Sequence, residues 1–208
     1  MALVAAAAIV ASVMVGCEKE GDVKRVNIPS QIHVKVGQTY DLGSTQSWSS
    51  NKTFVASVNG NGVITGQHVG ECTVSCADGS CRVIVQANVN LFEDPITQWG
   101  WNRAQVFSKA GSNYQQTSEG NYTYETGNGI APYLVYTFTN GSLTSALLMV
   151  KTSYTNQVVD HLSERYKFMY KEGTSFIFLD GNSMTDATTM VILKYYNSTY
   201  WAVFYSEK

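Results

Sequence analysis

The sequence predicts a mostly β-structured chain in two parts. The first is a small all-β sandwich of short strands, and the second is an α+β domain of two repeats, each one helix followed by four strands of an antiparallel sheet. Three observations predict this. Short runs of alternating apolar and polar residues are separated by Gly and Asn. Tyrosine is abundant, at 13 residues, and proline is scarce, at 3. Two stretches, near residues 105 and 157, have apolar residues at helical spacing instead.

Residues 1–17 are typical of an export signal rather than of a folded element. Residues 1–15 are apolar but too few to span a membrane, and charges begin at Glu18. The run ends Gly16-Cys17, which resembles the lipobox of bacterial lipoprotein signals, although Met14 stands where Leu is usual. The resemblance implies a lipid on Cys17, a tether over residues 18–22, and a chain anchored at the outer membrane or cell surface. An ordinary cleaved signal is the alternative, and the lack of a basic residue before the run suggests an upstream start codon.

Residues 23–88 contain six strand candidates with turn signals between them, which favours a small sandwich. The candidates are 32–36, 39–42, 55–58, 63–65, 72–76 and 81–85. Val36-Gly37-Gln38-Thr39, Val55-Ala56-Ser57-Val58 and Gly62-Val63-Ile64-Thr65-Gly66 resemble the bacterial immunoglobulin-like (Big) domains of surface proteins. The resemblance implies that this part is a spacer or an adhesive unit.

Three cysteines, Cys72, Cys76 and Cys81, lie in the last predicted hairpin of that part. Export implies an oxidising compartment, so a disulfide is plausible. If the turn spans residues 77–80, Cys76 and Cys81 face each other and are expected to pair, while Cys72 stays a buried thiol. A zinc site is the alternative, but a fourth ligand and the usual paired spacing are missing.

An Asn-rich junction, expected to make few contacts, leads into residues 91–208, which contain the internal repeat. The repeat units are 91–152 and 153–208. Helix candidates begin near Gln105 and Gln157, and each precedes four strand candidates. These strands are 114–118, 122–126, 133–139 and 143–151 in the first unit, and 167–171, 175–179, 189–196 and 200–206 in the second.

The segment Trp99-Gly100-Trp101-Asn102-Arg103-Ala104-Gln105-Val106 resembles a helix start of small outer-membrane assembly lipoproteins and of beta-lactamase inhibitory proteins. Asn102 takes the N-cap place. Those inhibitors also consist of two helix-plus-four-strand units, so the resemblance implies a binding protein. A saddle like that of the TATA-binding protein is the competing architecture, but it needs a basic face that this chain lacks.

Composition and motifs argue against nucleic-acid binding and against catalysis. The net charge is −2 and 14% of residues are charged, so no basic field attracts nucleic acid. The three histidines, His33, His68 and His161, fall in separate predicted elements, and His161 and Arg165 are expected on a solvated helix face. No nucleophile, phosphate-loop or metal motif occurs, so we expect no catalytic residue, metal or cofactor. A pair of distant carboxylates, as in glycoside hydrolases, stays open.

The predicted binding residues come from the last hairpin of each repeat. If Asn140-Gly141 and Asn197-Ser198 are two-residue turns, strand alternation puts one set of residues under the helices and the other on the open face. The set expected on the open face includes Tyr133, Lys194, Trp201 and Tyr205. Tyr200 and Phe204 are then expected in the core. Aromatic rings around a lysine are typical of a binding hot spot, and mutual packing of these rings is the alternative.

Together these features predict a non-catalytic lipoprotein whose Ig-like part is a spacer and whose repeat part binds a protein or a glycan. The alternative is a structural lipoprotein that faces the periplasm and docks on an outer-membrane complex.

Overall fold

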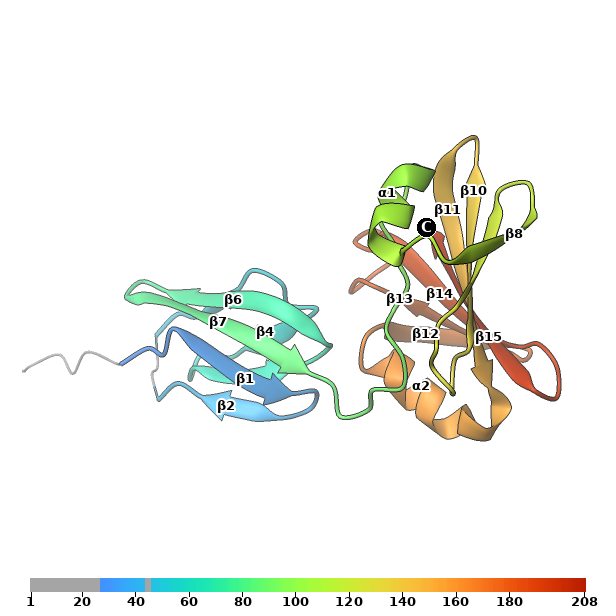
Figure 1. Ribbon diagram of the computed structural model, residues 1–208. Coiled ribbons are helices and arrows are strands. Elements are labelled where there is room, and N and C mark those ends of the chain that lie inside the picture. Colours follow the sequence, from blue (N-terminus) through green and yellow to red (C-terminus); the bar gives the residue numbers. More distant parts are fainter. Residues whose placement is uncertain (1–26, 44–45) are drawn as a thin grey trace, which may run out of the picture.

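The computed structural model describes residues 27–43 and 46–208, so Cys17 and the segments 1–17 and 18–22 lie outside the described residues. Within these ranges the chain consists mainly of β-strands in three sheets (Figure 1). The β-rich class predicted from the sequence is therefore confirmed. None of the helices in the described ranges is long and apolar enough to cross a membrane.

The first part consists of two small sheets that share one apolar core. The four-stranded sheet has the order β1 (Gln31–Lys35), β7 (Gly79–Gln86), β6 (Gly70–Cys76), β3 (Ser49–Ser50). The three-stranded sheet has the order β2 (Thr39–Asp41), β5 (Val63–Gly66), β4 (Ala56–Val58). Strand β1 runs parallel to β7, and the other pairs are antiparallel. Val74 and Val83 of the first sheet and Ile64 of the second are fully buried in the same cluster, as alternation requires.

The predicted disulfide is absent from this hairpin, because its turn is shorter than expected. Cys72, Cys76 and Cys81 are all free thiols. Cys76 pairs with Gly79, so the turn is two residues long, and Cys81 lies further along β7, opposite Val74. The prediction that Cys76 and Cys81 face each other is therefore wrong. Cys72 is a buried thiol, as expected.

The second part is one eight-stranded antiparallel sheet with two helices. Along the chain, four strands follow each helix. The first set is α1 (Arg103–Ala110), β8 (Tyr114–Ser118), β9 (Asn121–Glu125), β10 (Tyr133–Thr139) and β11 (Ser142–Lys151). The second set is α2 (Thr155–Ser163), β12 (Lys167–Glu172), β13 (Ser175–Leu179), β14 (Thr189–Tyr195) and β15 (Tyr200–Glu207). The order in the sheet is β12-β13-β14-β15-β11-β10-β9-β8, so the last strands of the two sets, β15 and β11, pair at its centre.

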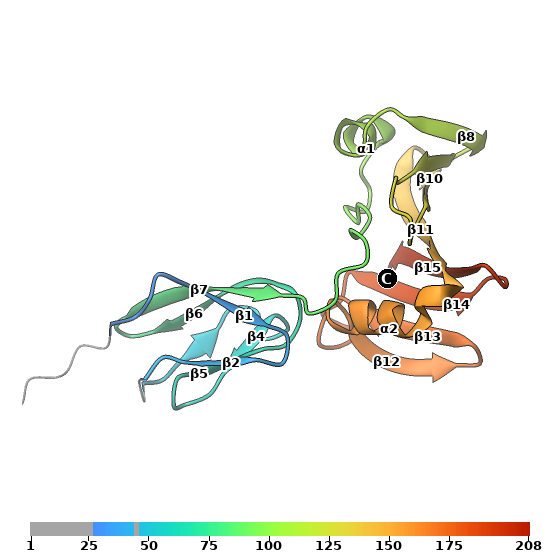
Figure 2. The same cartoon turned by 60° about the horizontal axis from the view of Figure 1, so that its bottom comes forward.

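Both helices and the segment that leads into α1 cover the same face of this sheet (Figure 2). Val106 of α1 and Val158 and Leu162 of α2 are fully buried. They belong to one cluster with alternate residues of the central strands, such as Leu148 and Val203. The opposite face of the sheet therefore carries no helix of the described chain.

Helix α1 begins where the sequence predicts. The Asn102 side chain accepts a hydrogen bond from the backbone N–H of Gln105 at 3.0 Å, and the Gln105 side chain accepts one from the backbone N–H of Asn102 at 3.0 Å. This reciprocal capping box satisfies two N–H groups that a helix start leaves without partners. Asn102 is thus the N-cap, as expected.

Candidate functional site

Two of the four predicted binding residues, Tyr133 and Lys194, lie on the open face of the eight-stranded sheet. They belong to one cross-strand row, in which Tyr133 pairs with Met149, Met149 with Ala202, and Ala202 with Lys194. Tyr133 is 40% exposed, and Lys194 is also exposed.

Trp201 and Tyr205 lie on the opposite face, so their predicted placement is wrong. Tyr205 is fully buried, and its hydroxyl donates to Asp94 Oδ1 at 3.2 Å. Trp201 is half-buried beside α2, where its indole N–H donates to Thr155 Oγ1 at 2.8 Å. Both residues therefore belong to the helix side of the sheet.

The error comes from the length of one turn. A two-residue turn at Asn197-Ser198 would pair Tyr195 with Tyr200, but Tyr195 pairs with Trp201. The Asn197 side chain accepts hydrogen bonds from the backbone N–H groups of Thr199 and Tyr200, both at 2.9 Å, which stabilises the longer loop. A shift of one residue turns every side chain of a strand to the other face. Consequently Tyr200 and Phe204 are on the open face, and not in the core as predicted.

With this register, an uninterrupted row of apolar side chains crosses the open face of the sheet. Its members pair directly from strand to strand, from β10 through β11, β15, β14 and β13 to the edge strand β12. The residues are Val135, Leu147, Phe204, Ile192, Ile177 and Tyr170. We call them the apolar row. Phe204 is 37% exposed and Tyr170 is 53% exposed, which is unusual for large apolar side chains at neighbouring positions.

Further apolar side chains lie beside this row, and few charged ones do. The adjacent cross-strand row brings Tyr133, Met149 and Ala202 next to it. Among the described residues on this face of β10, β11, β14 and β15, Lys151 and Lys194 carry the charge. The open face thus combines an apolar centre with two ammonium groups.

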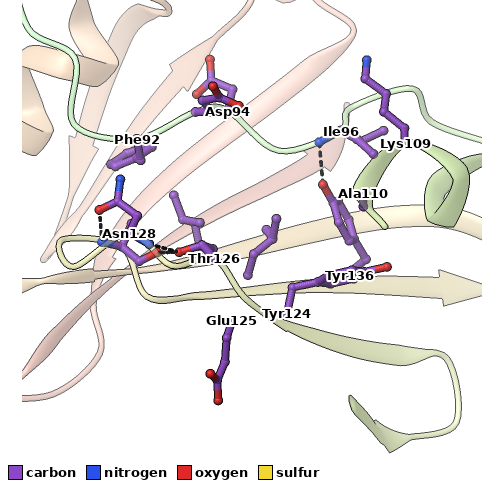
Figure 3. A pocket seen from close by; sticks show the side chains of 14 residues that line it. Phe92, Asp94, Ile96, Lys109, Ala110, Tyr124, Glu125, Thr126, Asn128 and Tyr136 are labelled. Atoms are coloured by element: carbon purple, nitrogen blue, oxygen red, sulfur yellow. Dashed lines mark hydrogen bonds between the residues drawn. The ribbon is translucent and has the colours of Figure 1, made fainter. Parts of the chain in front are cut away.

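A pocket of about 620 Å³ lies on the helix side of the sheet, below the segment that enters α1. Phe92, Asp94 and Ile96 of that segment form one wall, and Tyr124 and Tyr136 of β9 and β10 form the other (Figure 3). The Tyr136 hydroxyl accepts a hydrogen bond from the backbone N–H of Ile96 at 2.9 Å, which holds the two walls together. The residue types and the size are those of a small-molecule site.

Beside the pocket, the junction segment is fixed to the end of α2 by several polar contacts. Glu164 Oε2 accepts from the backbone N–H groups of Asn88 at 2.8 Å and Val89 at 2.9 Å. The Arg165 guanidinium donates to the carbonyl of Val89 at 3.1 Å and lies 3.7 Å from Asp94 Oδ2. The expectation that the Asn-rich junction makes few contacts is therefore wrong.

His161 lies at the centre of this polar cluster and is fully buried, so the expectation of a solvated position is also wrong. Its Nδ1 accepts a hydrogen bond from the backbone N–H of Leu91 at 3.2 Å, and its Nε2 is 3.9 Å from Asp94 Oδ1. Burial lowers the pKa of His161 below its ordinary value. It also raises the pKa values of Tyr166 and Tyr205 well above theirs, and nearby Asp94 adds to both shifts. The groups are thus held in their neutral forms, which suits a structural lock.

The sequence contained a signal for this cluster that the analysis of motifs missed. His161 follows Val158 by three residues and precedes Arg165 by four, so all three share one side of α2 with the buried Leu162 nearby. Its place beside an apolar stripe indicated burial.

Among residues 27–43 and 46–208, no group of three or more His, Cys, Asp or Glu side chains is arranged to hold a metal ion. Comparison with known proteins gives no relationship to build on: no protein-family model matches the chain, and no curated protein matches it.

Proposed function

We propose that this chain is a bacterial envelope lipoprotein, anchored through Cys17, that binds a partner protein without catalysing a reaction. The observation that carries the proposal is the apolar row on the open face of the eight-stranded sheet. It spans six neighbouring strands and is bordered by Tyr133 and Lys194. Monomeric proteins rarely leave such a continuous apolar surface open unless it binds something.

The arrangement of the chain supports a display function. In our proposal residues 23–88 are an immunoglobulin-like spacer, since two small sheets share one core there. Residues 91–208 are a tandem repeat, since each of two helices is followed by four antiparallel strands and the sets join through β11 and β15. The spacer would hold the repeat part away from the membrane.

The composition of the open face favours a protein over a glycan as the partner. Leu147, Ile192 and Val135 are aliphatic, and they offer apolar contact area rather than hydrogen bonds to sugar hydroxyls. Aromatic residues such as Phe204 and Tyr170 add contact area at low entropic cost. Lys151 and Lys194 would pair with acidic groups at the edge of the partner's surface.

Site-specific photo-crosslinking in living cells tests this proposal. A photoreactive phenylalanine analogue at Phe204 should give a discrete protein adduct after irradiation. The same analogue at Tyr196, an exposed aromatic residue in the β14–β15 loop outside the row, should give none. Equal adducts at both positions, or none at Phe204, would argue against a protein-binding row.

The anchor and its orientation need separate tests. Cys17→Ser should abolish labelling by a fatty-acid analogue and release the protein into the soluble fraction; labelling that persists would refute the lipid anchor. Protease added to intact cells should remove a surface-displayed protein. It should spare one that faces the periplasm and docks on an outer-membrane complex, which is the alternative role.

A further inference from the structure

We propose that the pocket below the junction segment binds a small organic cation: an ammonium ion on a compact aromatic or branched apolar body. This site is separate from the apolar row, because the pocket lies on the helix side of the sheet. It goes beyond the proposed protein-binding function and does not depend on it.

The pocket walls supply the apolar half of the recognition. Phe92, Tyr124 and Tyr136 contribute three aromatic rings, and Leu134, Leu148 and Ile96 contribute aliphatic surface. Tyr124 and Tyr136 pack edge to face with ring centroids 5.7 Å apart. These rings are largely buried in the protein, so their positions are fixed before a ligand arrives.

Most polar groups that line the pocket are already engaged within the protein. The Asn128 side chain accepts from the backbone N–H groups of Ile130 and Ala131 and donates to the carbonyl of Leu91. The Tyr124 hydroxyl donates to the carbonyl of Gly111 at 3.1 Å. The Tyr136 hydroxyl accepts from Ile96 and has no acceptor for its own proton among the described residues, so it can donate to an oxygen of a ligand.

The charges at the rim select the sign of the ligand. Glu93, Asp94 and Glu125 line the pocket with a single ammonium group, that of Lys109. Glu93, Glu125 and Lys109 have no hydrogen bond or ion pair to any other described residue, whereas Asp94 is occupied by Tyr205 and Arg165. Figure 3 shows the Glu125 side chain directed away from the aromatic rings, so it acts through its field rather than by contact.

Aromatic walls and an excess of carboxylates both favour a positive charge. The faces of aromatic rings attract cations, and this attraction adds to that of the carboxylates at the rim. An anion of the same shape would meet repulsion from both. The combination therefore points to a cation with an apolar body, and not to a fatty acid or another organic anion.

Three probes with the same phenol ring separate charge from shape: tyramine is a cation, tyrosol is neutral, and 4-hydroxyphenylacetate is an anion. Binding to the detergent-solubilised full chain is measured by calorimetric titration. We expect tyramine to bind roughly tenfold more tightly than tyrosol, and the anion to bind most weakly.

Two sets of variants locate the site. The double variant Glu93→Gln and Glu125→Gln should keep the affinity for tyrosol but lose most of the preference for tyramine, while Glu119→Gln, an exposed carboxylate outside the pocket, should change neither. Leu134→Trp should fill the pocket and abolish binding of all three probes. Val135→Trp, on the opposite face of the same strand, should leave binding intact.

Similar affinities for the three probes, a preference for the anion, or no saturable binding would each overturn the proposal. So would tyramine binding that survives in folded Leu134→Trp. Should that variant fail to fold, the carboxamide double variant still decides, because its changes lie at exposed rim positions.

Discussion

His161 is held neutral by the groups packed around it. Burial lowers its pKa, the nearby carboxyl of Asp94 opposes that shift, and the Arg165 cation adds to it. Glu164 also opposes the shift, from the same helix end. Its Nδ1 must stay unprotonated to accept from the backbone N–H of Leu91. A proton on Nδ1 would put two donors face to face and break the contact that fixes the junction segment.

Protonation of His161 is therefore expected to destabilise the fold in mild acid. A lowered folded-state pKa means that the unfolded chain binds the proton more readily. The stability is thus fully present above the unfolded value near 6.5, and it is lost as the pH falls from there toward the lower folded value. His68, whose pKa is also lowered mainly by burial, contributes in the same direction.

Denaturant unfolding measured between pH 7.5 and 5 checks this, the range being set about one unit above and below the ordinary histidine pKa. His161→Gln should be less stable than the native protein at pH 7.5 but should lose less stability on acidification. His33→Gln, at an exposed position, should leave the slope unchanged. A native pH dependence retained in His161→Gln would exclude this histidine as its source.

At the scale of elements, strand β15 has aromatic residues on both faces, so composition could not reveal its orientation. Tyr200 and Phe204 point to the open face, while Trp201 and Tyr205 point to the core. The one-residue difference in the β14–β15 turn decided which set was buried. In the β10–β11 hairpin, by contrast, Asn140 and Gly141 both have positive φ, of 52° and 83°, as a two-residue hairpin turn requires, and the expected pairing at the turn is present.

This contrast explains how much the sequence could predict. The strands, the two helices and the capping residue Asn102 follow from periodicity and local chemistry, which are visible in short windows. Registers depend on turn lengths that a single-residue change alters, as at Asn197 and at Ala77. The pocket and the His161 cluster depend on the path of residues 88–96 across the sheet, which no local pattern indicates.

Adjacent residues of β15 should respond oppositely to truncation. Tyr205→Ala removes a fully buried ring and a hydrogen bond to Asp94, and it should cost about 3–5 kcal/mol of unfolding free energy. Phe204→Ala affects a partly exposed ring on the open face and should cost about 1 kcal/mol or less. Urea denaturation of both variants checks the register, since the two-residue-turn register predicts the reverse order.

At the scale of the whole molecule, the two parts meet at the C-terminal end of α2. The carbonyl of Glu164 accepts from the backbone N–H of Val69 at 2.8 Å, and the side chain of Asn182 donates to Thr53 Oγ1 at 3.1 Å. Glu164 thus binds the first part through its main chain and the junction through its side chain. One residue at the end of a helix consequently orients both.

Glu164→Ala should remove the side-chain acceptor of two junction N–H groups while leaving the main-chain contact to Val69. We expect a loss of about 1–2 kcal/mol in unfolding free energy and faster proteolysis near Asn88. Ser163→Ala, at the exposed neighbouring position, should stay within about 0.5 kcal/mol of the native protein. Unchanged proteolysis of Glu164→Ala would show that the junction is held by other contacts.

The central position of β15 has a consequence for the time course of folding. Residues 200–207 are made after the other seven strands of the sheet, yet they lie between β14 and β11. Until they emerge, the two sets of strands cannot join, and the partner of Asp94 at Tyr205 is missing. Pairings this distant in sequence form slowly. On the proposed export route, the repeat part would therefore stay open while it is threaded across the inner membrane, and would close only after its final strand had passed.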